Sequence, residues 1–294
     1  MAFERLRGEA RDLVELVLVP GAAALMPWRI GYRLLRHASR WDWLYREETQ
    51  AALAQASARG WAPDPQYWAR IRRLVALVDH ADYYLARTRS DKWLARHVDV
   101  QGDWPAPGKA GVLCTFHWGA GMWALRHASA HGLRPHALVS LPREVHFAGR
   151  TVFRKYSQAR ARNVVATLGR VALETSVSLR PMMRALERGD QVIAAIDVPA
   201  DQVSASQDMN ILGVVARVPR GLMRLAIDHR LPVTVFVTGF DLASGRRFVR
   251  IHRMGVRSDR QELMREVFDV LDSAIRENPP AWHFWSESER FFVS

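Results

Sequence analysis

From Gly111 onward, short apolar runs alternate with segments whose apolar residues recur at helical spacing. The runs have the length and the Val, Ile and Ala content of buried strands. The predicted strands are Gly111–Phe116, Pro135–Leu141, Gln191–Ile196, Pro232–Phe240 and Arg247–Arg253, and the predicted helices are Ala120–His131, Gly149–Ala159, Leu179–Arg188, Pro219–His229 and Asp259–Glu277. Such alternation predicts an α/β fold with a mixed, mainly parallel sheet flanked by helices.

The chain before this region has a helical pattern. Apolar residues keep a four- and three-residue spacing from Tyr67 to Val78, and the composition from Trp41 to Arg96 is rich in Ala, Leu, Arg and Glu. The stretch Gln101–Gly111 contains several glycines and prolines, through which a helix cannot continue. We therefore expect a helical N-terminal region over residues 1–100 and an α/β domain over residues 101–294.

The most apolar N-terminal run, Leu13–Met26, is interrupted by Glu15 and Pro20. It is shorter than the roughly 20 apolar residues that a membrane-spanning helix needs. Acidic residues precede it, which is not the pattern of a secretory signal. We interpret this run as an interfacial or re-entrant membrane segment.

A basic amphipathic helix follows the apolar run. Its arginines recur at helical spacing beside a stripe of apolar residues, and tryptophan and tyrosine rings of the kind that settle at headgroup depth accompany them. These residues are Arg29, Arg33, Arg36 and Arg40, the stripe Ile30, Leu34, Ala38 and Trp41, and the rings of Trp28, Tyr32, Trp41 and Trp43. We expect this region to associate with an anionic membrane surface. The alternative is a helix whose apolar stripe packs on the protein's own core.

Charge narrows the range of partners. The chain carries 42 Lys and Arg against 30 Asp and Glu, a formal net charge of +12, which attracts phosphate in lipid headgroups, substrates or nucleic acid. We expect no nucleic-acid partner, because the basic residues are dispersed and no recognisable reading module is present. The single cysteine, Cys114, excludes an intramolecular disulfide and a Cys-rich metal site, and we expect it to be a small buried apolar residue.

The passage most informative about chemistry is Val112–Leu125, which contains His117-Trp118-Gly119. It places a histidine at the carboxyl end of a buried strand, before small residues and a helix, where α/β folds bind ligands. The amides at a helix N-terminus there also suit an anion. Taken alone, a histidine at such a position is more often structural than catalytic.

This passage resembles the His-x-x-x-x-acid motif of the lipid A lauroyl and myristoyl acyltransferases, a branch of the glycerolipid acyltransferase superfamily. The segment Ile196–Gln202 looks like the Asp-containing strand end of that family. Further similar segments follow in the same order, so that the resemblance extends over residues 30–292: Gly213, Val218–Ala226, Leu231–Val233, Trp285 and Arg290.

The resemblance implies a membrane-associated O-acyltransferase of lipid biosynthesis. Such an enzyme moves a fatty acyl group from the thioester of acyl carrier protein or coenzyme A to a hydroxyl of a glycolipid or related membrane lipid. It implies His117 as the general base, no metal and no cofactor. The expected location is the cytoplasmic face of a bacterial inner membrane, as a peripheral or monotopic protein.

One residue departs from the family motif. Five positions after His117, where the family has Glu or Asp, this chain has Met122, which cannot orient an imidazole. Loss of such a carboxylate costs a histidine-dependent hydrolase about 10⁴ in rate. Asp197 and Asp201 are candidates to replace it, and Glu144 is a weaker one, although Asp197 could equally be a helix cap or loop carboxylate. Otherwise His117 works without a partner, or the chain is a catalytically divergent homologue that binds lipid or acyl carrier protein.

Substrate contacts are expected from two further sets of residues. The family has basic substrate-binding residues after the second strand, where this chain has Arg150, Arg154, Arg160 and Arg162, and Arg220 lies in a further matching segment. Trp118, Met122 and Trp123 are candidates to line an acyl tunnel, since such pockets are mainly apolar, and Gly119 is a further candidate for substrate contact. The alternatives are solvated surface arginines and core packing.

Overall fold

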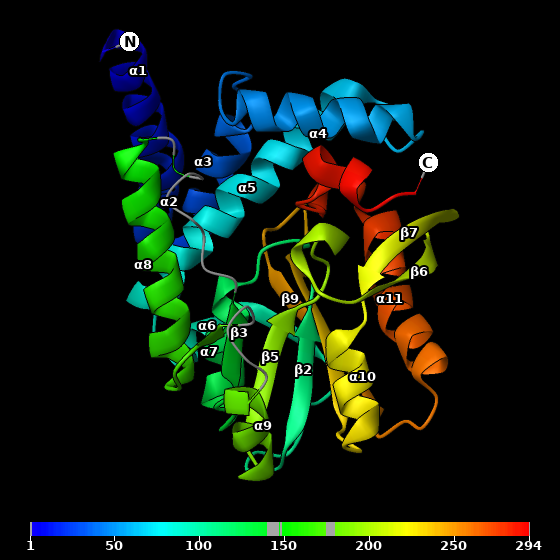
Figure 1. The fold of residues 1–294 in the computed structure, drawn as a ribbon. Helices are drawn as coiled ribbons and strands as arrows, with labels where there is room; N and C mark the ends of the chain where they lie inside the picture. Colours follow the sequence, from blue (N-terminus) through cyan, green and yellow to red (C-terminus); the bar gives the residue numbers. More distant parts are fainter. Residues whose placement is uncertain (1, 140–146, 148, 175–179, 294) are drawn as a thin grey trace.

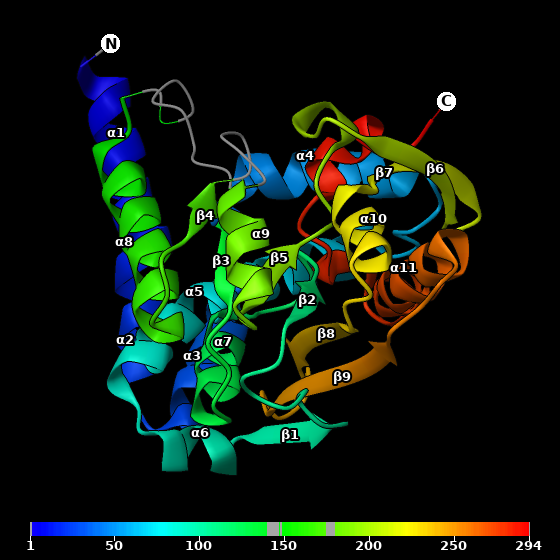
Figure 2. The same cartoon turned by 60° about the horizontal axis from the view of Figure 1, so that its bottom comes forward.

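The computed structural model describes residues 2–139, 147, 149–174 and 180–293. At its centre is a seven-stranded sheet (Figure 1), with the strand order β1-β9-β8-β2-β5-β3-β4, whose strands are labelled in Figure 2. All neighbouring strands run parallel except β8 and β9, which form an antiparallel hairpin. The strands are β1 (Val98–Gln101), β2 (Gly111–Thr115), β3 (His136–Val139), β4 (Leu173–Glu174), β5 (Gln191–Ala195), β8 (Val233–Phe240) and β9 (Arg247–Gly255). The predicted fold class is confirmed.

Helices cover both faces of this sheet, as Figure 2 shows from below. On β2, Val112 and Cys114 belong to the core cluster that contains residues of α9, α10 and α11, whereas Leu113 belongs to the cluster with α6 and α7. Successive residues of a strand point to opposite faces, so a strand buried on both sides is apolar throughout. The helices are α6 (Asp91–Arg96), α7 (Met122–Ala130), α8 (Thr151–Leu168), α9 (Arg180–Glu187), α10 (Gly221–Asp228) and α11 (Arg260–Glu277).

The N-terminal region begins with α1 (Ala2–Leu13), a π-helical turn over Val14–Leu18, and α2 (Val19–Leu25). It continues with α3 (Trp28–Ala38), α4 (Arg46–Ala58) and α5 (Pro65–Thr88). α3 crosses α2 closely, because a Cβ added at Gly31 would lie 2.1 Å from the carbonyl oxygen of Ala23. Among the described residues, no helix has the length and apolar character needed to cross a membrane.

One apolar core joins the N-terminal helices to the sheet. Tyr32 of α3 and Leu74 of α5 belong to the same cluster as Val235 of β8. The indole of Trp28 donates a hydrogen bond to Gly245 O at 2.8 Å. Trp28 and Tyr32 are 5% and 2% exposed, so their expected position at headgroup depth is wrong. Their rings anchor α3 to the body, and of the four rings expected at headgroup depth only Trp41 and Trp43 are exposed.

A second, two-stranded sheet was missed by the sequence pattern. β6 (Ser206–Ile211) and β7 (Val214–Pro219) pair antiparallel through the two-residue turn Leu212–Gly213. Both turn residues have positive φ, as the turns that suit a two-residue hairpin require. The polar composition of β6 hid the strand. β7 also pairs with the end of the chain, where Val293 N donates to Val215 O at 2.9 Å.

Candidate active site

The register of the sheet brings His117 and Asp197 together. β2 and β5 are parallel neighbours in which Thr115 is opposite Ala195. Two residues beyond this pair on each strand come His117 and Asp197, at the carboxyl edge of the sheet where α/β folds place ligands. The two residues are 80 positions apart in the chain, and the parallel pairing alone makes them neighbours.

Asp197 holds both the backbone and the ring of His117. Its Oδ1 lies 2.9 Å from Nδ1 of the imidazole, and both carboxylate oxygens accept from His117 N at 2.9 Å. The Asp197 side chain is 1% exposed, whereas the His117 side chain is 42% exposed. An ionised carboxylate only accepts, so the neutral ring carries its proton on Nδ1 and has its lone pair on Nε2.

The charge environment favours protonation of His117. Burial by itself lowers the pKa of the imidazole, but the negative charge of Asp197 and its hydrogen bond to Nδ1 outweigh that effect. The more distant carboxylates of Asp79 and Glu287 act in the same direction. The pKa of His117 is therefore raised above its ordinary value, which makes Nε2 a stronger base than a free imidazole.

The segment after α11 closes one side of the dyad. Trp282 donates from its indole to Asp197 Oδ2 at 3.0 Å, and His283 N donates to His117 O at 2.8 Å. Phe284 packs edge-on against the His117 ring, with centroids 4.7 Å apart. Gly119 has a φ of +73° and leaves no room for a side chain, because an added Cβ would lie 2.0 Å from Thr238 O. The glycine therefore lets this loop pass close to β8.

Met122, at the first position of α7, is a buried packing residue. It is 8% exposed and belongs to an apolar cluster with Leu16, Tyr83 and Tyr156. These neighbours come from the N-terminal helices and from α8. The residue at the family's acid position is thus core packing between helices, and Asp197 supplies a carboxylate to the imidazole from the neighbouring strand.

The other two candidate acids differ from Asp197 in position. Asp201 forms an ion pair with Arg290, whose Nη2 lies 2.8 Å from Asp201 Oδ1, and its side chain is 63% exposed. Asp201 does not contact His117 among the hydrogen bonds of the described residues. Glu144 lies outside the residues that the structure describes.

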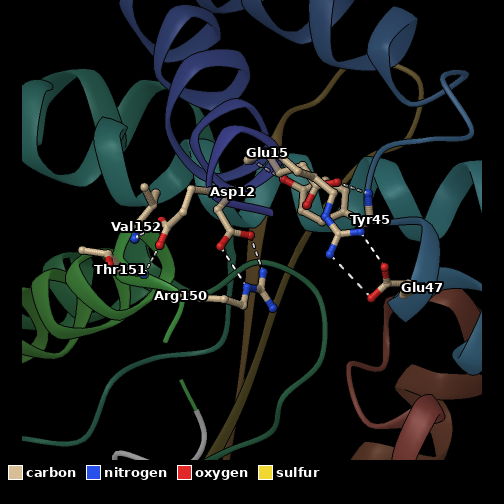
Figure 3. Close-up of polar contacts among 9 residues, drawn as sticks. Asp12, Glu15, Tyr45, Glu47, Arg150, Thr151 and Val152 are labelled. Atoms are coloured by element: carbon tan, nitrogen blue, oxygen red, sulfur yellow. Dashed lines mark hydrogen bonds and ion pairs between the residues drawn. The ribbon is translucent and has the colours of Figure 1, made fainter. Parts of the chain in front are cut away.

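Arg150 is engaged by the N-terminal helix (Figure 3). It precedes α8 and forms a two-pronged ion pair with Asp12, with Nε 2.9 Å from Oδ2. One turn earlier in α1, Glu9 accepts from the first amides of α8, Thr151 N at 2.5 Å and Val152 N at 2.7 Å. These contacts fix the start of α8 and occupy the guanidinium that the sequence assigned to substrate.

The remaining candidates for substrate contact are spread over the fold. Arg154 is half-buried and Arg162 exposed on α8, and Arg220 is half-buried immediately before α10.

Trp118, next to His117, is 4% exposed and packs on Phe248, while Trp123 is fully buried. Trp118 and Trp123 are therefore packing residues.

Arg160, which the sequence grouped with the substrate-binding arginines, instead belongs to a buried polar network beside the dyad. Arg160 of α8 donates to Asp79 Oδ2 at 2.8 Å, and His80 Nδ1 lies 2.7 Å from Tyr156 OH. Burial opposes ionisation of Asp79, but Arg160 lowers the pKa of this carboxyl below its ordinary value. Burial lowers the pKa of His80 to about 4, so that ring is neutral. Adjacent Asp79-His80 on a predicted helix was the one available signal of this network.

Compared with known proteins, the chain matches no family model, and no curated protein is significantly similar to it. The resemblance to the lipid A acyltransferases therefore depends on the motifs themselves. The molecular basis for a function is the geometry of His117 and Asp197.

Proposed function

We propose that this protein is an O-acyltransferase that moves a fatty acyl group from a carrier thioester to a hydroxyl of a glycolipid or related membrane lipid. The observation that carries the proposal is the pairing of His117 Nδ1 with buried Asp197, at 2.9 Å, while the His117 side chain remains 42% exposed. A carboxylate on one nitrogen and an accessible lone pair on the other is the arrangement of a general base.

The proposed reaction uses each nitrogen of His117 differently. Nε2 takes the proton of the acceptor hydroxyl, whose oxygen attacks the thioester carbonyl carbon. Collapse of the tetrahedral intermediate breaks the carbon–sulfur bond, and the imidazolium returns the proton to the leaving thiolate. Asp197 keeps the Nδ1 proton in place throughout and stabilises the imidazolium. The products are an ester and a free carrier thiol.

The decisive experiment is an acyl-transfer assay with purified protein, acyl carrier protein or coenzyme A thioesters and a bacterial membrane lipid extract. We expect the wild type to form a new acyl ester and His117→Ala to abolish it, because Nε2 is the base. His229→Ala is the matched control, since His229 is an exposed histidine at the end of α10. Equal activity of wild type and His117→Ala, or no activity with any donor and acceptor, contradicts the proposal.

A second candidate function is lipid or carrier binding without acyl transfer. Met122 at the position of the family's motif acid favours it. The same assay separates the two functions, because a binding protein retains acyl carrier protein or lipid in a pull-down while it forms no ester.

We further propose that the protein binds the cytoplasmic face of a bacterial inner membrane through its N-terminal helices. Leu18, at the end of the π-helical turn, and Leu25, at the end of α2, are 53% and 75% exposed. Ile30, beside Arg29 on α3, is 53% exposed. Exposed apolar side chains with neighbouring arginines suit the interface of an anionic bilayer.

Vesicle sedimentation tests this membrane surface. The double variant Leu25→Asp and Ile30→Asp should bind anionic vesicles several-fold more weakly than the wild type, since it adds charge at the proposed interface. Val171→Asp is the control, because Val171 is 72% exposed between α8 and β4. Equal loss in both variants, or no vesicle binding by the wild type, contradicts the surface. Truncation of residues 1–40 is unsuitable, because it removes buried Trp28 and Tyr32.

A further inference from the structure

The segment Pro280–Phe284, here called the strap, is bonded to the backbone of the His117 loop. His283 N donates to His117 O at 2.8 Å, and Gly119 N donates to Ala281 O at 3.0 Å. The ring of His283 adds a third contact, with Nε2 2.7 Å from Gly119 O. The backbone hydrogen bonds at His117 and Gly119, on both sides of Trp118, join the strap to this loop in the manner of two paired strands.

Trp282, at the centre of the strap, fixes the carboxylate of Asp197. Its indole donates to Oδ2 at 3.0 Å, while Oδ1 faces His117 Nδ1 at 2.9 Å. Trp282 is 2% exposed and Asp197 1%, so water has little access to either group. The indole bond therefore sets which oxygen faces the imidazole and limits rotation of the carboxylate.

Arg72 of α5 fixes the strap in turn. Its guanidinium is 2% exposed and donates to three strap carbonyls: Trp282 O at 2.8 Å, His283 O at 3.0 Å and Pro280 O at 3.3 Å. Glu48 of α4 balances the buried charge, with Oε1 2.8 Å from Nη2. A planar guanidinium can serve several carbonyls at once, which a lysine ammonium on a flexible stem does less well.

We propose that Trp282 and Arg72 are positioning residues for His117: Trp282 orients Asp197 toward the imidazole, and Arg72 holds Trp282 by clamping the strap. This positioning role rests on the proposed function in one respect: it matters for catalysis only if His117 is the general base. It makes the N-terminal helices α4 and α5 part of the active-site machinery, although neither of them supplies a residue to the dyad.

NMR of the His117 ring tests the first step without any substrate. In the wild type, the nitrogen shifts should report the tautomer with the proton on Nδ1. In Trp282→Phe, the carboxylate of Asp197 is no longer held toward Nδ1, so this tautomer should be less populated and the pKa of His117 should fall by roughly half a unit or more. Trp285→Phe is the matched control. Trp285 is also fully buried, and its indole donates to Pro279 O at 2.6 Å rather than to Asp197.

Hydrogen exchange tests the second step. Arg72→Lys keeps the buried charge but loses the fork, so the amides of His283 and Gly119 should exchange about tenfold faster or more, because local opening becomes easier by about 1.4 kcal/mol. The pKa of His117 should shift in the same direction as in Trp282→Phe. Arg73→Lys is the control, since the neighbouring Arg73 is also buried but donates to Ser39 O instead. If Trp282→Phe fails to fold, Arg72→Lys still tests the positioning role.

The outcomes separate this inference from the proposed function. If Trp282→Phe and Arg72→Lys fold and leave the tautomer, the pKa of His117 and the strap amides as in the controls, the positioning role is wrong, whatever the enzyme does. If these quantities move as expected while no acyl transfer is found in the wild type, the positioning role stands and the proposed function fails. In an active enzyme, both variants should lower kcat more than they change KM.

Discussion

Two buried carboxylates of this protein each pair with a basic residue from a distant part of the chain, and the two pairs differ in whether the basic residue is exposed to solvent. Asp82 of α5 pairs with Arg247 of β9, and both side chains are fully buried. Asp197 pairs with His117, and only the carboxylate is buried. A buried pair can only join structural elements, whereas a pair with one accessible partner can exchange a proton with a ligand. Exposure of the partner, rather than the presence of the carboxylate, distinguishes the candidate catalytic pair.

The surroundings of the two pairs reinforce this difference. The guanidinium of Arg247 lies 4.0 Å from the ring centroid of Trp28, which places it between α3 and α5. Burial raises the pKa of Asp82 to about 6 in spite of Arg247. In the exposed pair, the carboxylate instead raises the pKa of its partner, His117. The first pair ties the N-terminal helices to the sheet, and the second tunes a base.

The largest expected effect is on catalysis, from Asp197→Asn. An amide that replaces an orienting carboxylate costs about 10⁴ in kcat in a serine protease triad, and we expect a loss of that order in the acyl-transfer assay. The pKa of His117 should also fall, because burial then acts without the carboxylate that most strongly opposes it. Asp201→Asn is the control, as this exposed acid pairs with Arg290. A comparable loss in both variants would show that Asp197 has no special role.

The next effect is on stability, from Arg247→Ala. Removal of Arg247 leaves Asp82 buried without its counter-charge, so that the carboxyl must take up a proton or stay charged, at a cost of about 3–5 kcal/mol in the free energy of unfolding. Urea denaturation measures this. The adjacent Arg246→Ala should cost less than about 1 kcal/mol, because Arg246 and its partner Asp99 are exposed. If Asp197→Asn destabilised the protein as much as Arg247→Ala, the distinction between the two pairs would be lost.

A smaller effect is expected from Met122→Glu, which restores the acid of the family motif. Because Asp197 already occupies Nδ1, the added carboxylate should give no gain in rate. It would enter the apolar cluster of Leu16, Tyr83 and Tyr156, and an unpaired polar group there costs about 1–3 kcal/mol. Met122→Leu, which conserves volume, should be nearly neutral. A rate increase in Met122→Glu would mean that the imidazole of the wild type is poorly oriented.

The sequence predicted the sheet better than the site. Continuous apolar runs such as Gly111–Phe116 identify strands buried on both faces, and a parallel sheet follows from their alternation with helices. The same reasoning placed His117 and Asp197 at one edge, but their pairing depends on strand order, which a local pattern does not contain. β6 was missed because its residues are polar. Arg72 and Trp282 were missed because their roles exist only after residues 72, 197 and 282 are brought together by packing.

The pH dependence of kcat/KM gives the finest test of the comparison, because in the proposed function only the accessible pair takes part in proton transfer. His117 acts as a base only when neutral, so the rate should fall about tenfold per pH unit below its pKa. Asp197 raises that pKa above the ordinary 6.5, so the acidic limb should lie above 6.5. The raised pKa means that protonated His117 stabilises the fold below 6.5, and this contribution is lost as pH rises through the folded-state value. The NMR pKa of His117 should match the kinetic limb. An acidic limb below 6.5, or one that differs from the NMR value, would assign the kinetic proton to another group.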